Sequence, residues 1–188
     1  MTQRDTMTDA LSSVLSAIMA GELYSEFITP AEFKRGMRQI ATPTAIATSS
    51  WNGEPAGLTV SSFCSLNSAP PRMLVCINRS AGAFPLLAEG RNLGLNVLAT
   101  HHQALAMQFA SSDNRPQRFE MGDWGTIMTG APILLDSVVA FDCRVVSIHE
   151  MDTHGIVIAD VVGMLCASSD VPLLYRDGKF VTIAPGGV

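Results

Sequence analysis

The sequence has few charged side chains and few aromatic ones. Charged residues make up 15% of the 188 residues and aromatic residues 6%, whereas hydrophobic residues make up 47%. This composition excludes a disordered chain and predicts one domain with a sizeable core, with or without a short appendage. The 12 Lys and Arg against 17 Asp and Glu give a formal charge of −5, which argues against a general nucleic-acid surface.

Long hydrophobic runs are missing as well, since no apolar segment approaches the roughly 18 to 20 residues that a membrane-spanning helix needs. The apolar segment 11–21 resembles a signal-peptide core, but Asp5 and Asp9 outweigh Arg4 in front of it, so we do not expect secretion. The same segment has helical spacing, which predicts one apolar helix face. The residues on that face are Leu11, Val14, Leu15 and Ile18.

Paired cysteines are also absent. The four cysteines lie far apart in apolar contexts, with no C-x-x-C pair: Cys64, Cys76, Cys143 and Cys166. Free thiols in such contexts behave as small hydrophobic side chains, and reduced cysteines are typical of the cytoplasm. We therefore expect buried, reduced cysteines in a cytoplasmic protein.

The common catalytic motifs are missing. The sequence contains no G-x-x-x-x-G-K-[ST] phosphate loop, no G-x-S-x-G nucleophile elbow and no Rossmann glycine pattern before a helix. Adjacent His101 and His102 would point about 100° apart on a helix, and no acid-rich cluster accompanies His149 or His154. We therefore expect no metal site.

The order of local signals predicts a mainly β (α+β) fold. Thr29, Pro30 and Glu32 form a capping box for a helix that should end before Pro43. Asn52-Gly53 and Asp177-Gly178 are typical of tight hairpin turns. Strands are predicted at 44–50, 56–63, 72–78, 93–98, 138–148, 156–166, 173–175 and 180–183, and helices at 84–88 (closed by Gly90) and 103–110. Without regular β-α-β alternation, a closed or nearly closed antiparallel barrel fits best. The long polar segment 111–131 is expected to be a functional or interfacial loop.

Two small polar clusters stand where strands should end. Thr59, Ser61 and Ser62 supply hydroxyls and amides on an otherwise apolar strand, and Asn78-Arg79-Ser80 precedes a predicted helix, a natural anion site. From the residues alone an ordinary alternative stays open. Ser80 would then only cap the helix, Arg79 would be solvated, and the hydroxyls would be ordinary strand residues.

An ordered series of motifs connects these clusters. Gly57–Ser80, GLTVSSFCSLNSAPPRMLVCINRS, resembles the signature of the short-chain flavin reductase family, the reductase components of two-component flavin-dependent monooxygenases such as 4-hydroxyphenylacetate 3-monooxygenase. Further matches follow in order: FPLL at 84–87, NVL at 96–98, RF with the later W and TGAPIL within 118–134, FDCRV at 141–145, THGIVIADV at 153–161 and LLYRDGKF at 173–180. Each motif alone is weak, but the ordered series is specific and covers about 33–183.

The resemblance implies an FMN-binding split β-barrel over 29–188 that acts as a homodimer, with an N-terminal helical extension over 1–28. It implies that FMN or FAD is reduced by NADH or NADPH and released to a partner monooxygenase. The residues carried over for cofactor binding are Thr59, Val60, Ser61, Ser62, Asn78, Arg79, Ser80, Phe84, Asn96 and Tyr175. His154 would lie by the nicotinamide, with positioning favoured over obligatory proton donation, and Trp51 and Trp124 would be packing or dimer-contact residues.

Hydride transfer between two bound ring systems needs alignment more than a reactive side chain, which agrees with the missing catalytic motifs. Two other functions remain as alternatives: a reductase of a bulky acceptor such as a corrinoid that holds its flavin tightly, and a non-enzymatic flavin- or haem-binding split-barrel protein. Pro43 stands where relatives commonly have a glycine-valine turn. Gly82-Ala83 leaves the phosphate region open to either flavin.

Overall fold

The computed structural model describes residues 27–111, 115–166 and 171–183, together with Ser12, Leu15, Ser16 and Met19. The chain divides into two units, Met1–Gln39 and Ile40–Val188. Of the apolar face predicted for a helix around 11–18, Leu15 is described, whereas Leu11, Val14 and Ile18 lie outside the described residues. The domain boundary predicted between residues 28 and 29 stays a prediction.

In the first unit, helix α2 (Pro30–Met37) begins at the predicted capping box. Glu32 N donates to Thr29 Oγ1 at 3.3 Å, and Thr29 N donates back to Glu32 Oε2 at 2.9 Å. Side chains therefore satisfy these two amides of the first turn. The helix ends at Met37 with Arg38 as its C-cap, well before Pro43, as predicted.

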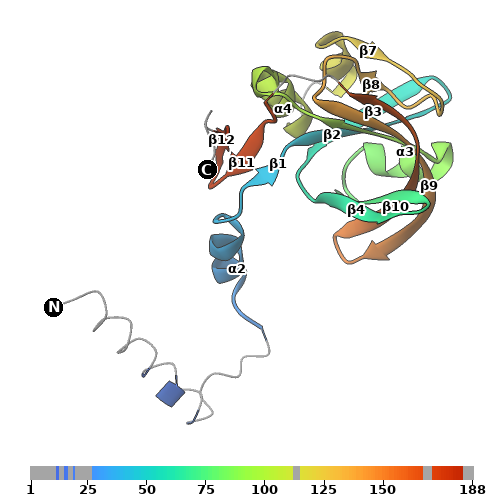
Figure 1. The fold of residues 1–188 in the computed structure, drawn as a ribbon. Coiled ribbons are helices and arrows are strands. Elements are labelled where there is room, and N and C mark those ends of the chain that lie inside the picture. The colour runs from blue at the N-terminus through green and yellow to red at the C-terminus, as the bar shows by residue number, and fades with distance from the viewer. Residues whose placement is uncertain are drawn as a thin grey trace. The chain divides into compact units, whose positions relative to one another are not determined.

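The second unit is built on a seven-stranded antiparallel sheet in the order β3-β2-β6-β9-β10-β5-β4 (Figure 1). Its strands are β2 (Ala45–Trp51), β3 (Glu54–Val60), β4 (Phe63–Ser68), β5 (Pro71–Asn78), β6 (Asn92–Val97), β9 (Val139–Met151) and β10 (His154–Cys166). The sheet curls around α3 (Ala83–Gly90), whose Phe84 and Leu87 join the main core. Arg91, and not Gly90, takes the left-handed conformation that ends this helix.

Shorter elements flank the curled sheet. Three strands form a second sheet in the order β1-β11-β12, and two more pair with each other. Their bounds are β1 (Thr42–Pro43), β7 (Trp124–Gly125), β8 (Ile133–Leu134), β11 (Leu174–Arg176) and β12 (Lys179–Val181), with helices η1 (Thr100–His102), α4 (Gln103–Ala110) and η2 (Arg115–Glu120). The mainly β prediction is confirmed. The predicted turns at Asn52-Gly53 and Asp177-Gly178 have the positive φ angles that tight hairpins require.

One predicted strand, 56–63, is divided in the structure. β3 ends at Val60 and pairs with β2, whereas β4 begins at Phe63 and pairs with β5. These two strands occupy opposite edges of the seven-stranded sheet, so Ser61 and Ser62 carry the chain from one edge to the other. The polar pair therefore lies where the barrel is split, with both residues exposed.

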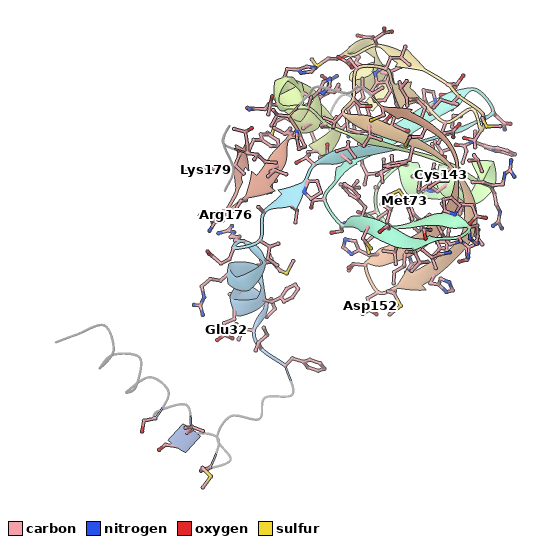
Figure 2. All side chains as sticks on the ribbon, viewed as in Figure 1. Glu32, Met73, Cys143, Asp152, Arg176 and Lys179 are labelled. Carbon is pink, nitrogen blue, oxygen red and sulfur yellow. The ribbon has the colours of Figure 1, made fainter. Side chains whose placement is uncertain are left out.

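Two apolar clusters fill the interior. The larger lies between the curled sheet and α3, and the smaller joins α4 to Ile46, Leu134 and Leu173. Figure 2 shows Met73 and Cys143, which belong to the larger cluster, inside the sheet, whereas Asp152 lies at the β9–β10 turn. Gly94 permits a close approach of strands here, because a Cβ atom would lie 2.5 Å from the backbone oxygen of Pro132.

All four cysteines are free thiols, but the prediction that all are buried is wrong for Cys64 and Cys166, which are exposed. Each lies in a strand, Cys64 in β4 and Cys166 in β10, and alternate side chains of a strand face outward even when the neighbouring residues are apolar. Burial, with the nearby Asp142 and Asp160 carboxylates, raises the pKa of Cys143 to about 12. Within the described residues, the helices are all too short or too polar to cross a bilayer.

Candidate functional site

Two pockets meet at the end of β3, and Thr59 and Ala110 border both of them. The first has a volume of about 280 Å³ and a lining rich in polar groups: Thr59, Asn78, Ser80, Ser111 and Arg118. The second has a volume of about 180 Å³ and a largely apolar lining that includes Val60, Met107, Tyr175 and Phe180. We call them the polar pocket and the ring pocket.

Local hydrogen bonds shape the polar pocket. Asn78 Oδ1 accepts from both the backbone N and the Oγ of Ser80, each at 2.9 Å, which folds the chain just before α3. Arg118 is 8% exposed; its Nη1 donates to Gly57 O at 2.8 Å and its Nη2 donates to Ser111 O. The pocket thus has a fixed buried cation and hydroxyls in its wall, a combination suited to an anion such as a phosphate.

The ring pocket lies between β3, α4 and the hairpin of β11 and β12. Thr59 Oγ1 donates to Ala106 O at 2.6 Å, which ties the strand to the helix. The Tyr175 and Phe180 rings lie 5.5 Å apart between centroids on the hairpin side. Thr44 Oγ1 is buried without a hydrogen-bond partner among the described residues. An apolar wall with a few hydroxyls suits a flat heteroaromatic ring.

Comparison with known proteins decides the family. A model of the flavin reductase like domain matches residues 37–184, most of the chain. The chain belongs to this family.

Relatives and solved structures agree with this flavin reductase assignment. The FMN reductase (NADH) RutF 2 of Methylorubrum extorquens strain PA1 is 37% identical over 160 residues, which cover 85% of this chain and 92% of the relative. A crystal structure described as a flavin reductase from Haemophilus somnus 129PT has a TM-score of 0.80 at 33% identity, covering 83% of this chain and all of that one. Nitrilotriacetate monooxygenase component B from Mycobacterium thermoresistibile has a TM-score of 0.77 at 27% identity, covering 82% and 87%. The resemblance and the split-barrel fold are confirmed.

Six of the ten residues carried over from the flavin reductase family border the two pockets: Thr59, Val60, Ser61, Asn78, Ser80 and Tyr175. Ser62 lies next to them at the split, where its carbonyl accepts from Cys76 N at 2.9 Å. The structure thus brings the two predicted polar clusters together around Thr59. Their roles toward a flavin stay predictions.

Phe84 and Asn96 lie in the interior. The Phe84 ring packs on Gly155, where a Cβ atom would come within 2.3 Å of it. Asn96 is fully buried; its Nδ2 donates to Ile46 O at 3.1 Å and its Oδ1 accepts from Leu134 N at 2.8 Å. Both side chains therefore have structural contacts that hold the strands and α3 in place beside the pockets.

Arg79 and His154 lie at the β9–β10 hairpin. Arg79 Nη2 forms an ion pair with Glu150 Oε2 at 2.5 Å, and Nη1 donates to Asp152 O at 3.2 Å. His154 is exposed and pairs with Asn78 across β10 and β5. Its Nδ1 lies 2.8 Å from Thr153 Oγ1. The imidazole is thus next to a residue of the polar pocket, although neither His154 nor Arg79 lines that pocket.

The polar pocket is also bordered by three residues that were not predicted as site residues: Arg118, Ala110 and Phe109. Arg118 stands in a motif that matches the flavin reductases and in the predicted functional loop, and these two signals pointed to it. Ala110 has no chemistry of its own, so only its place in space reveals it. Trp124 packs on Phe109 and Phe119, with centroids 5.5 and 5.0 Å away, which confirms its packing role.

His101 and His102 do not diverge as their sequence spacing suggested. They lie in a tight turn with ring centroids 3.9 Å apart, and each Nε2 approaches Asp136 Oδ2, at 3.4 and 3.1 Å. Ala99 N donates to His102 Nδ1, which leaves Nε2 as the ring nitrogen that donates to Asp136. Burial would raise the pKa of Asp136, but the hydrogen bond and charge of His102, with a further hydrogen bond from His101, lower it. The three side chains offer ligand atoms within 4.8 Å of one another, so the premise that the two histidines point apart is wrong, and the absence of a metal site stays a prediction.

Proposed function

We propose that this chain is an NADH-dependent FMN reductase that supplies reduced flavin to a separate oxygenase component. The observation that carries the proposal is the junction of the ring pocket and the polar pocket at Thr59. Relatives named FMN reductase (NADH) support the choice of FMN and NADH, and the monooxygenase component among the similar structures supports the partner.

Bound flavin would supply the hydride-accepting ring, and the chain would supply alignment and a local electrostatic environment. Thr59, Val60 and Ser61 would hold the edge of the ring, with Tyr175 covering its face. Ser80 and Arg118 would hold the phosphate, since hydroxyl and guanidinium donors suit its oxygens. Donors fixed at the ring edge stabilise the negative charge that develops on reduction, without a side chain that exchanges protons.

The direct test is a steady-state assay of NADH oxidation with purified protein. With excess FMN and oxygen, we expect turnover that depends on FMN and a protein that loses its flavin during gel filtration. NADPH and FAD in parallel reactions measure the preference for each cofactor. Retention of flavin through the column would favour the reductase of a bulky acceptor such as a corrinoid. Flavin binding without NADH oxidation would favour the non-enzymatic protein and contradict the proposal.

We also propose that the protein is a homodimer that joins through the outer face of β4, β5 and β10. Cys64, Leu74 and Ile158 are register neighbours across these three strands. Five apolar side chains on this face are exposed or half-buried: Cys64, Leu74, Cys76, Ile156 and Ile158. An apolar patch of this kind, bordered by the Arg72–Asp160 ion pair, is typical of an interface between subunits.

Ile158→Glu is expected to convert the dimer to a monomer. In the dimer, each copy would bury the new carboxylate beside apolar side chains such as Leu74, with no partner for its charge. Sedimentation velocity measures the change, and circular dichroism checks that the barrel remains folded. Met121→Glu, at another exposed apolar side chain, is the matched control and should remain dimeric. A dimer that persists in Ile158→Glu would show that the copies join elsewhere.

Two further assignments complete the proposal. The four free thiols support a cytoplasmic location, where cysteines stay reduced. We propose that residues 1–28 are an extension and that the reductase domain begins with α2. The family model begins at residue 37, so within this proposed domain of 29–188 most of α2 would precede the part that the family shares.

A further inference from the structure

The side chain of Arg79 is held away from the polar pocket, although the residues on both sides of it line that pocket. Asn78 and Ser80 are lining residues, whereas the Arg79 guanidinium contacts Glu150 and the carbonyl of Asp152 on the β9–β10 hairpin. The Arg79 backbone N donates to Thr153 O at 3.0 Å, which fixes the backbone but leaves the side chain its rotatable bonds.

The ion pair between Arg79 and Glu150 is weak enough for another anion to replace Glu150. Its two side chains are 42% and 55% exposed. An exposed pair of this kind shifts an equilibrium by a factor of at most about five, because water and salt screen it. A phosphate monoester carries nearly two negative charges at neutral pH and accepts two parallel hydrogen bonds from a guanidinium. A phosphate in the neighbouring pocket can therefore compete with the single carboxylate of Glu150.

We propose that Glu150 is a specificity-determining residue that competes with the phosphate of the flavin for Arg79. In the empty site Arg79 pairs with Glu150, and when a phosphorylated flavin binds, the guanidinium turns from Glu150 to the phosphate. The cost of breaking the pair lowers the affinity for phosphorylated flavins only. This inference rests on the proposed function, and it supplies a physical reason for flavin that exchanges instead of staying bound.

Equilibrium binding of FMN and riboflavin, measured by flavin fluorescence, tests the proposal, since riboflavin lacks the phosphate. Glu150→Gln should bind FMN about three to five times more tightly and riboflavin unchanged, because a neutral amide no longer competes. Asp152→Asn is the matched control: it removes a carboxylate from the same hairpin, but Asp152 contacts Arg79 through its backbone oxygen. Its affinity for FMN should stay within about 1.5-fold of the wild type, since Asp152 is exposed and water and salt screen its charge.

A double-variant cycle separates competition from a general change of charge. In an Arg79→Gln background, Glu150→Gln should leave the affinity for FMN unchanged, because there is no guanidinium to release. Equal changes for FMN and riboflavin, no change for FMN, or a persistent effect without Arg79 would each overturn the inference while leaving the reductase function intact. A wild-type protein that binds neither flavin would overturn the proposed function and this inference with it.

Discussion

Ala110→Trp is expected to lower kcat/KM for FMN reduction by at least about 100-fold, about 2.7 kcal/mol of transition-state stabilisation. Ala110 is the last residue of α4, is exposed, and borders both the polar pocket and the ring pocket. An indole at this shared wall would occupy the junction through which a ring and its phosphate tail would have to pass. The fold should persist, because the added ring replaces solvent and not packed atoms.

Three measurements check this prediction: NADH oxidation with FMN, flavin affinity by fluorescence, and the thermal unfolding midpoint. Ala104→Trp is the matched control, since Ala104 is exposed on the same helix but borders neither pocket. It should keep activity within about twofold of the wild type, as is usual for an exposed substitution away from the site. Wild-type flavin affinity in Ala110→Trp would mean that flavin binds elsewhere on the molecule.

The elements of this fold that could be predicted from the sequence are those specified by short-range chemistry. The capping box of Thr29 and Glu32 fixes where α2 begins, and Asn52-Gly53 tolerates the positive φ angles of its hairpin. α4 was predicted with its observed bounds, Gln103–Ala110. In each case the residues that decide the structure lie within a few positions of one another, so one sequence window contains the whole signal.

The break at Ser61-Ser62 could not be predicted, because it depends on pairing partners far away in the sequence. Strand propensity continues through 56–63, and only the pairing of β3 with β2 and of β4 with β5 divides the segment. The bond between Thr59 and Ala106, which places α4 beside the split, also joins residues 47 positions apart. The candidate site forms at this junction, so the sequence could predict its motifs but not the shape of its pockets.

Asn96 and the histidine pair show how tertiary contacts redirect polar side chains. Asn96 was expected to line the flavin site, but it bridges Ile46 O and Leu134 N inside the barrel. His101 and His102 were expected to diverge, but a tight turn and the shared Asp136 carboxylate bring their rings together. A buried polar group takes whichever partners the fold supplies, and these partners come from strands that no local pattern identifies.

Arg118→Met is expected to destabilise the protein by about 3 kcal/mol and to weaken FMN binding more than riboflavin binding. The substitution keeps much of the apolar stem of Arg118 beside Phe109 but removes the donors to Gly57 O and Ser111 O. Hydrogen bonds from a charged group contribute about 1.5 to 3 kcal/mol each to stability. In the variant, the backbone carbonyls of Gly57 in β3 and Ser111 at the end of α4 would lose this donor. A loss of this size lowers the unfolding midpoint of a chain of this length by about 6 to 12 °C.

The effect on binding has a separate cause, because Arg118 also lies in the wall of the polar pocket and would donate to the phosphate. FMN affinity should fall about tenfold more than riboflavin affinity, about 1.4 kcal/mol, as is typical of one lost charge-assisted contact. Arg118→Lys should recover part of the FMN preference through its charge but little of the stability, since one ammonium cannot replace the guanidinium fork. Arg144→Met, at an exposed arginine of β9, is the control and should change neither quantity. An unchanged midpoint together with an unchanged ratio of FMN to riboflavin affinity would remove Arg118 from the site and leave the polar pocket without its buried cation.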